Sequence, residues 1–126
     1  MTAAELKYIT AIKELYDGTV GIKLISIAAK MNVTKVSVYR AVERLENHGY
    51  IKRDEKNKVV MTEHGYEQLE KYNVLIGWLN NHLQKYCRVS AETAYNDAIG
   101  AVCAFSDETR LAMAEFMAKA EEKVND

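Results

Sequence analysis

Apolar residues recur at helical spacing through the middle of the chain and predict the elements around which the rest is organised. Over residues 25–61 the pattern indicates a helix, a tight turn, a second helix and a short β-hairpin. In the second helix Val38, Val42 and Leu45 recur at i, i+4 and i+7. This spacing places the three side chains on one stripe, which we expect to face the first helix.

The opposite face of the second helix is polar. At about 100° of rotation per residue, Ser37, Arg40 and Arg44 point away from the apolar stripe. Thr34 stands at the start of the helix, where its hydroxyl can accept a hydrogen bond from an otherwise unpaired backbone amide. We therefore interpret this helix as the recognition helix of a winged helix-turn-helix.

Two short strand-like segments follow the recognition helix. Gly49 ends the helix, and residues 50–53 and 59–61 are rich in strand-forming side chains. The polar segment DEKNK, residues 54–58, separates them and can form the turn. A basic β-hairpin, or wing, is the expected structure.

Helices are also predicted on both sides of this motif. Residues 3–17 alternate apolar and charged side chains at helical spacing, which is typical of an amphipathic helix. Thr62 begins the longest helix, which runs to about residue 87. Ser90 and Ser106 are expected to cap two more helices.

The helices after residue 61 offer more apolar surface than a small monomer is expected to cover. Apolar side chains recur along the long helix at alternating intervals of three and four residues, and the next helix has a face of alanines. We predict a homodimer whose interface is formed by Leu69, Tyr72, Ile76, Leu79, Leu83, Ala94, Ala98 and Ala101.

The predicted fold is therefore mainly α with a small β-hairpin wing. Residues 1–61 form a winged helix-turn-helix DNA-binding domain, and residues 62–126 form a linker helix with a helical dimerisation domain.

Charge is distributed unevenly along the chain, although the net charge is only −1. Residues 33–58 contain seven Lys or Arg against four Asp or Glu, whereas residues 89–126 contain three against eight. Such asymmetry can arise by chance on a solvated surface, but here the basic segment coincides with the helix-turn-helix motif. It favours a protein of which one end contacts phosphate.

The sequence thus predicts binding to a double-stranded DNA operator. Base contacts are expected from Ser37 and Arg40, because arginine can form a bidentate pair with guanine. Phosphate contacts are expected from Lys35, Arg44, Lys52, Arg53 and Lys58. The alternative is a protein-interaction module that uses the same scaffold without an operator.

Other classes of function find little support in the sequence. No Gly-rich phosphate loop, nucleophile elbow or pair of catalytic carboxylates occurs, so we do not expect an enzyme. No apolar run approaches the roughly 20 residues that span a bilayer, and the N-terminus is unlike a secretory signal. Cys87 and Cys103 are too few for a disulfide framework, so a cytoplasmic protein with reduced thiols is expected.

The sequence resembles the short, two-lobe form of the metal-dependent repressor family that includes the diphtheria toxin repressor and the manganese transport regulator. The resemblance covers nearly the whole chain and rests on VSVYRAVERLENHGYI, VVMTEHG and, most specifically, YNDAIGAVCAFSDET. It implies a dimeric repressor that binds its operator under the control of Mn²⁺ or Fe²⁺. It also adds Thr34 and Val36 to Ser37 and Arg40 as residues that meet the DNA groove.

The metal ligands of that family have no counterpart in this sequence. The positions that the resemblance assigns to them are occupied by Lys7, Thr10, Ile76, Ile99, Val102 and Cys103. None of these side chains has the carboxylate or imidazole lone pairs that Mn²⁺ and Fe²⁺ prefer. We therefore expect no metal cofactor and DNA binding that is independent of these ions. A small apolar effector, or a soft-metal site built from His82, Cys87 and Cys103, is the alternative.

Overall fold

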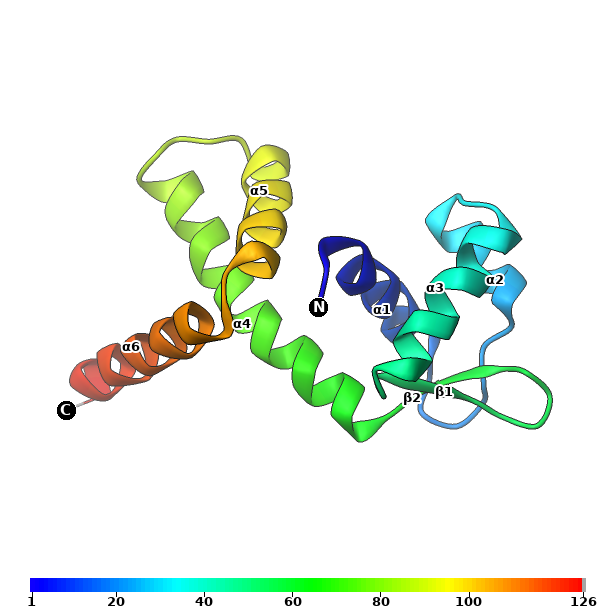
Figure 1. Ribbon diagram of the computed structural model, residues 1–126. Coiled ribbons are helices and arrows are strands. Elements are labelled where there is room, and N and C mark those ends of the chain that lie inside the picture. Colours follow the sequence, from blue (N-terminus) through cyan, green and yellow to red (C-terminus); the bar gives the residue numbers. More distant parts are fainter. Residues whose placement is uncertain (126) are drawn as a thin grey trace. The chain divides into compact units, whose positions relative to one another are not determined.

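A computed structural model of the protein describes residues 1–125, with side chains described for residues 1–122 (Figure 1). The elements in chain order are α1 (Ala3–Leu15), α2 (Leu24–Met31), α3 (Lys35–Asn47), β1 (Ile51–Arg53), β2 (Val59–Met61), α4 (Glu63–Lys85), α5 (Ala91–Ala104) and α6 (Asp107–Asn125). The two strands form one antiparallel hairpin. This architecture confirms the predicted fold class.

The chain divides into two compact units, residues 1–70 and residues 71–126, so the division lies within α4. Each unit has buried apolar side chains of its own. Along the described residues, no helix combines the length and the apolar character that crossing a membrane requires.

The first unit is built on a core shared by α1, α2, α3 and the hairpin. Side chains exposed by 1% or less include Leu6, Ile9, Ile12, Ile27, Val38, Ala41, Val42, Leu45, Ile51 and Val59. Thr2 caps the start of α1, because its hydroxyl accepts a hydrogen bond from the amide of Glu5. The Glu5 carboxylate is buried and lies 3.2 Å from Nδ1 of His48, which ties the start of α1 to the end of α3.

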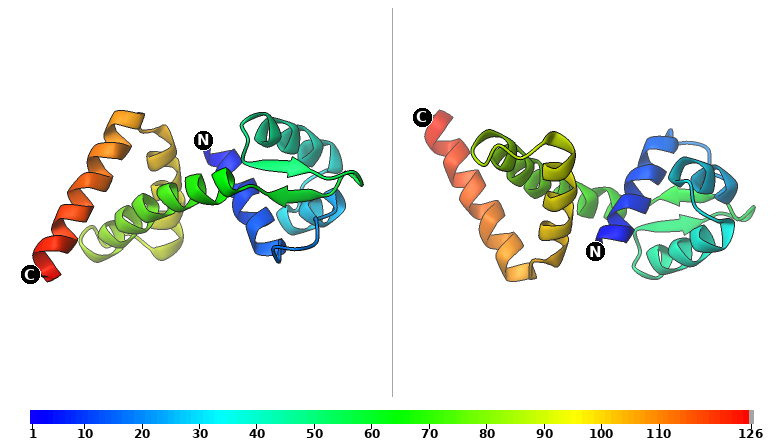
Figure 2. Two further views of the ribbon diagram at one scale, coloured as in Figure 1. Left: turned by 90° about the horizontal axis from the view of Figure 1, so that it is seen from below. Right: turned by 90° about the horizontal axis from the view of Figure 1, so that it is seen from above.

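The wing is held against the first unit by a segment that the sequence pattern did not predict as a strand. Ile22 and Val59 exchange both backbone hydrogen bonds at 2.8 Å, which adds an antiparallel bridge to the edge of the hairpin. Gly21 leaves the room for this approach, because a Cβ there would lie 2.7 Å from Cβ of Lys58. The turn of the wing projects beyond the helices of this unit (Figure 2).

A close backbone contact fixes the start of α4. Oγ1 of Thr62 donates to the carbonyl oxygen of Gly49 (2.6 Å) and accepts from the amide of Gly65 (2.9 Å), so Thr62 caps this helix as predicted. A Cβ on Gly65 would lie 2.0 Å from the carbonyl oxygen of Tyr50. Only glycine therefore allows α4 to start in contact with the backbone that follows α3.

In the second unit Arg110 joins three helices. Its guanidinium lies over the ring of Tyr72 in α4, 4.9 Å from the ring centroid. It also donates to the carbonyl oxygens of Val102 (3.2 Å) and Phe105 at the end of α5, and to the carboxylate of Asp107 in α6. The last carbonyl groups of a helix have no hydrogen-bond partner within it. Arg110 therefore supplies donors to the carbonyl groups at the end of α5 while it links α6 to α4.

The predicted dimerisation residues lie largely inside the chain. Leu69, Tyr72, Ile76, Ala94 and Ala98 are buried, with 0–6% of their surface exposed. Leu79, Leu83 and Ala101 are half-buried. A side chain that its own chain covers has little surface left for a second subunit, so the heptad-like spacing in α4 serves mainly the core of each unit. The three half-buried side chains still have surface for a second subunit, so the dimer interface stays a prediction.

Gly65→Ala tests the close contact at the start of α4. The added methyl group collides with backbone, which cannot rotate away, so we expect the free energy of unfolding to fall by at least about 2 kcal/mol. Gly77→Ala is the matched control in the same helix, because a Cβ there meets nothing within 4 Å. It should stabilise the chain by up to about 1 kcal/mol. Urea unfolding at one protein concentration, followed by circular dichroism, measures both; equal effects would refute the contact.

Candidate nucleic-acid interface

The orientation of α3 is set by its buried side. Val38, Val42 and Leu45 are 0% exposed, as the sequence pattern predicts, and Ala41 is 1% exposed. These side chains pack into the core of the first unit, so the opposite side of α3 faces solvent. The helix is therefore held rigidly with one polar surface outward.

The outward side of α3 bears the residues predicted to contact DNA. Lys35, Val36, Ser37, Arg40 and Arg44 are all exposed. Val36 is 62% exposed, although it is aliphatic. An exposed aliphatic side chain near the start of a recognition helix can contact the methyl group of thymine, and an arginine one turn later can pair with guanine.

The start of α3 is capped by Thr34, as predicted. Its Oγ1 accepts a hydrogen bond from the amide of Ser37 (3.1 Å) and donates to Oγ of Ser37 (2.9 Å). Ser37 can still donate its own hydroxyl hydrogen to a base edge or to phosphate. Thr34 thus positions Ser37. Thr34 is itself exposed, as a residue predicted to meet the DNA groove must be.

The turn of the wing is ordered by one carboxylate. Oδ1 of Asp54 accepts from the amides of Lys56 and Lys58, both at 2.9 Å, and Asn57 adopts a left-handed conformation with φ of 62°. Lys52 and Lys56 are exposed, and Lys58 is half-buried. The wing therefore presents ammonium groups from a defined loop.

Arg53 of the wing is engaged within the chain. Its Nη2 and Nε lie 2.7 Å and 3.2 Å from Oε1 of Glu46 in α3, and its amide donates to Oε2 of the same carboxylate (3.0 Å). The guanidinium also lies 5.6 Å from the ring centroid of Tyr39. These hydrogen bonds lower the pKa of Glu46 and raise that of Arg53. Arg53 therefore fastens the wing to α3, which limits its availability for phosphate.

A basic hollow of about 350 Å³ lies where α2 begins, α3 begins and the wing turns. Lys23, Lys35, Lys56 and Lys58 line it, so three separate segments contribute one positive surface. Lys23 and Lys56 were not among the sequence-predicted contacts. Only the fold brings them beside Lys35. The one signal for Lys23 in the sequence is its place directly before α2, the first helix of the helix-turn-helix. Such a surface suits the phosphate backbone of DNA.

The residues at the positions that the resemblance assigns to metal ligands do not fit Mn²⁺ or Fe²⁺. Ile76 and Ile99 are each 3% exposed and Val102 is 0% exposed. Their aliphatic side chains offer no lone pairs to Mn²⁺ or Fe²⁺. Of the others, Lys7 is exposed, and the Thr10 hydroxyl donates to the carbonyl oxygen of Leu6 (2.8 Å). Cys103 is half-buried.

The soft-metal site considered from the sequence does not form either. His82, Cys87 and Cys103 are all described, and no three His, Cys, Asp or Glu side chains in the described part of the chain gather as metal ligands. His82 instead lies between the rings of Trp78 and Tyr86, with centroid distances of 4.2 and 5.3 Å. Its Nδ1 is 2.8 Å from the carbonyl oxygen of Trp78, which fits a proton donor to that oxygen.

No protein-family model matches the sequence, and no curated protein does. Among solved structures, the fold is similar to that of a hypothetical protein from Sulfolobus solfataricus, with a TM-score of 0.75 and 21% identity over 94% of this chain and 91% of that one. It is similar to the manganese regulator SloR, with a TM-score of 0.71 and 19% identity over 90% of this chain and 53% of that one. It is also similar to the metal-dependent transcriptional regulator MtsR, with a TM-score of 0.71 and 17% identity over 94% of this chain and 55% of that one.

These similarities confirm, at the level of the fold, the resemblance to metal-dependent regulators predicted from the sequence. This chain spans about half the length of SloR and of MtsR.

The Glu46–Arg53 pair predicts a pH dependence of stability. Because Arg53 holds the pKa of Glu46 below its ordinary value of 4.5, the pair stabilises the folded chain above pH 4.5. This contribution is lost as the pH falls through the lowered pKa. We expect Glu46→Gln to reduce the free energy of unfolding at neutral pH by about 1 kcal/mol, and the difference from wild type to shrink below pH 4.5. Chemical denaturation at several pH values measures it.

The matched control is Glu43→Gln, which removes an exposed carboxylate from the same helix. Its effect should stay within about 0.5 kcal/mol at every pH. A Glu46→Gln difference that persists undiminished in acid would show that the ion pair is not its cause.

Proposed function

We propose that the protein is a homodimeric transcriptional regulator that binds a double-stranded DNA operator, with repression as the expected outcome. One observation supports this most directly: the polar side of α3 faces solvent beside a basic wing and a hollow lined by four lysines. Buried apolar side chains hold this surface in place. The similarity in fold to SloR and MtsR is in keeping with it.

In the proposed complex, α3 lies in the major groove. Arg40 pairs with a guanine, Ser37 donates or accepts at a neighbouring base edge, and Val36 contacts a thymine methyl group. Lys23, Lys35, Lys52, Lys56, Lys58 and Arg44 bind phosphate groups on either side. Because phosphate contacts release counterions from DNA, affinity should fall steeply as the salt concentration rises.

We propose that this binding does not require Mn²⁺ or Fe²⁺. SloR is described as a manganese regulator and MtsR as metal-dependent. In this chain three positions that the resemblance assigns to metal ligands are apolar and buried: Ile76, Ile99 and Val102. Aliphatic packing carries no cost of unpaired buried ligands, so it can hold these helices together without an ion. A small apolar effector remains the leading alternative means of control.

The rival function is a protein-interaction module that retains the scaffold without an operator. Selection of genomic DNA fragments by the purified protein separates the two, because an operator-binding protein enriches a sequence. No enrichment at low salt, where nonspecific affinity is strongest, would favour the rival.

Arg40→Ala tests base recognition. Loss of a bidentate contact to guanine should weaken operator binding by about 1–3 kcal/mol, or roughly 5- to 150-fold, and relax the preference at one base position. Fluorescence anisotropy with the selected operator and with variants at each position measures both effects. Arg40 is exposed, so the fold should be unaffected.

Lys52→Ala is the matched control for Arg40→Ala, because it removes an exposed cation from the same surface. It should weaken binding to all sequences alike and reduce the salt slope by about 1. If Arg40→Ala behaved in the same way as Lys52→Ala, the proposed base contact would be wrong.

A metal titration tests the proposed independence of Mn²⁺ and Fe²⁺. Chelator-treated protein should show no binding of either ion tighter than about 10 μM by calorimetry, and its operator affinity should be the same with and without each ion. Tighter stoichiometric binding accompanied by an increase in DNA affinity would contradict the proposal.

A further inference from the structure

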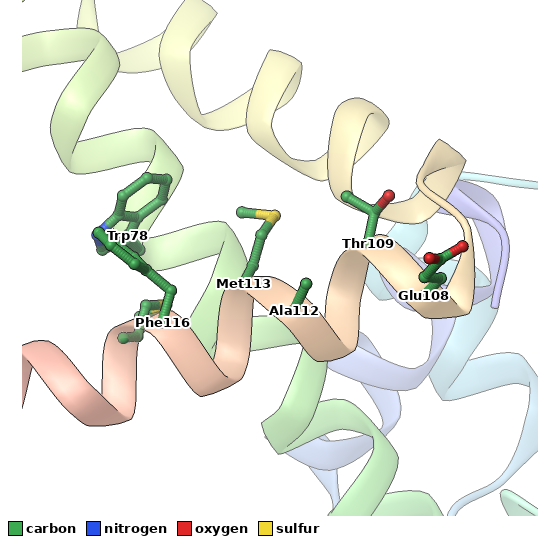
Figure 3. Close-up of a pocket in the computed structure, with 7 residues that line it drawn as sticks. Trp78, Glu108, Thr109, Ala112, Met113 and Phe116 are labelled. Atoms are coloured by element: carbon green, nitrogen blue, oxygen red, sulfur yellow. The ribbon is translucent and has the colours of Figure 1, made fainter.

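The second unit has a hollow between α4 and α6 that the proposed DNA contacts do not use. Its volume is about 500 Å³. Trp78 reaches from α4 toward Met113 and Phe116 of α6, and Glu108 lies near the start of α6 (Figure 3). All of these residues belong to the second unit. The volume falls within the range of roughly 300–1,000 Å³ that is typical of pockets for small molecules.

The walls of the hollow are aromatic and sulfur-containing. Trp78 contributes an indole ring, Phe116 contributes a phenyl ring that is 64% exposed, and Met113 and Met117 contribute half-buried thioethers. The ring of His82 packs on Trp78 with 4.2 Å between the centroids, which restrains the indole. Aromatic rings and thioethers attract another aromatic ring beyond the effect of burial alone. These walls therefore suit a ligand with flat rings.

The charge at the hollow is negative. Among the described residues that line it, Glu108 is the one with a charged side chain. Glu108 forms no salt bridge within the described part of the chain, whereas the neighbouring Asp107 is paired with Arg110. The surrounding segment, residues 89–126, holds eight acidic residues against three basic ones. The hollow therefore attracts a cation and repels an anion.

We infer that this hollow binds an aromatic organic cation. The rings of the ligand pack against Trp78 and Phe116, and its positive charge lies toward the carboxylate of Glu108. Aromatic rings also attract a cation through the negative charge of their faces, and tryptophan does so most strongly. Glu108 and Phe116 are eight residues apart, or about 12 Å along the helix, so the ligand has to be elongated. The inference goes beyond the proposed DNA binding and does not depend on it.

A neutral ligand of the same shape would complement the hollow less well. A molecule in the hollow displaces water near Glu108, and a carboxylate that loses water without gaining a partner is penalised. A cation replaces the lost hydration with an opposite charge. The same unit already holds one cation on an aromatic ring, because the guanidinium of Arg110 lies 4.9 Å from the ring centroid of Tyr72.

Rhodamine 6G, a fluorescent aromatic cation, is the probe that tests the inference. Its fluorescence anisotropy, measured against rising concentrations of the full chain, should give a Kd tighter than about 100 μM. Trp78 is the single tryptophan and lines the hollow, so the dye should also quench the tryptophan emission of the protein. This second signal places the dye at the hollow.

Glu108→Gln tests the role of charge at nearly constant shape. It should raise the Kd for rhodamine 6G about fivefold, because Glu108 is exposed and an exposed ion pair contributes up to about this factor. It should leave unchanged or lower the Kd for the anionic dye 1-anilinonaphthalene-8-sulfonate. Glu115→Gln is the matched control, because Glu115 is an exposed carboxylate of the same helix that does not line the hollow. It should change either Kd by less than about twofold.

Phe116→Ala tests the role of the rings. It should raise the Kd for rhodamine 6G about tenfold, because the dye loses an aromatic contact. Leu111→Ala is the matched control: Leu111 is 62% exposed on the same helix and lies about 140° around it from Phe116. It should change the Kd by less than about twofold. Circular dichroism checks that every variant keeps its helices.

Several results would overturn the inference. They are a Kd for rhodamine 6G weaker than about 1 mM, equal effects of Glu108→Gln and Glu115→Gln, equal weakening of the cationic and the anionic dye by Glu108→Gln, or no effect of Phe116→Ala. A dimeric wild type, measured by sedimentation velocity, whose tryptophan emission does not respond to the dye would show that a second copy fills the hollow. That outcome would also overturn the inference.

Discussion

The proposed DNA surface depends on the complete burial of one stripe of α3. Val38, Val42 and Leu45 are 0% exposed and lock the rotation of the helix about its axis. A rotation that exposed them would cost about 1.5–3 kcal/mol for each side chain, and the same rotation would turn Arg40 and Ser37 toward the core. Hydrophobic burial therefore determines which polar side chains can reach a base edge, even though it contributes no specificity of its own.

A second constraint fixes the wing relative to α3, and it divides the basic residues into two groups. Arg53 is held by both oxygens of Glu46 and lies beside Tyr39, so its charge serves the structure. Within the described part of the chain, the lysines of the wing form no ion pair with a carboxylate, and they are presented around a turn that Asp54 orders. This division follows from chemistry, because the guanidinium forms several directed hydrogen bonds, whereas an ammonium group acts more as a point charge.

The second unit is held together by apolar packing and by an internal cation. Ile76, Ile99 and Val102 pack where the resemblance would place ligands, and they are buried. Arg110 adds a fixed cation that satisfies carbonyl groups at the end of α5 and lies on the ring of Tyr72. Apolar packing and an internal guanidinium thus supply cohesion to the helices of this unit, which supports the proposal that control by Mn²⁺ or Fe²⁺ has been lost.

The sequence by itself determined the local features. The helices, the caps at Thr34, Thr62 and Ser90, and the outward side of α3 all follow from periodicity and from hydrogen bonds between near neighbours in the chain. Spacing could not show whether an apolar residue faces its own chain or a second one. Of the α4 residues predicted to form a dimer interface, Leu69, Tyr72 and Ile76 are buried within the chain, whereas Leu79 and Leu83 are half-buried.

Only the tertiary structure decided which distant segments meet. It paired Arg53 with Glu46, brought Lys23 beside Lys35 and Lys58, and placed Gly65 against the backbone of Tyr50. The physical reason is the same in each case. The role of a charge, or of a missing Cβ, depends on the atoms within a few ångströms of it, and residues far apart in the chain supply those atoms.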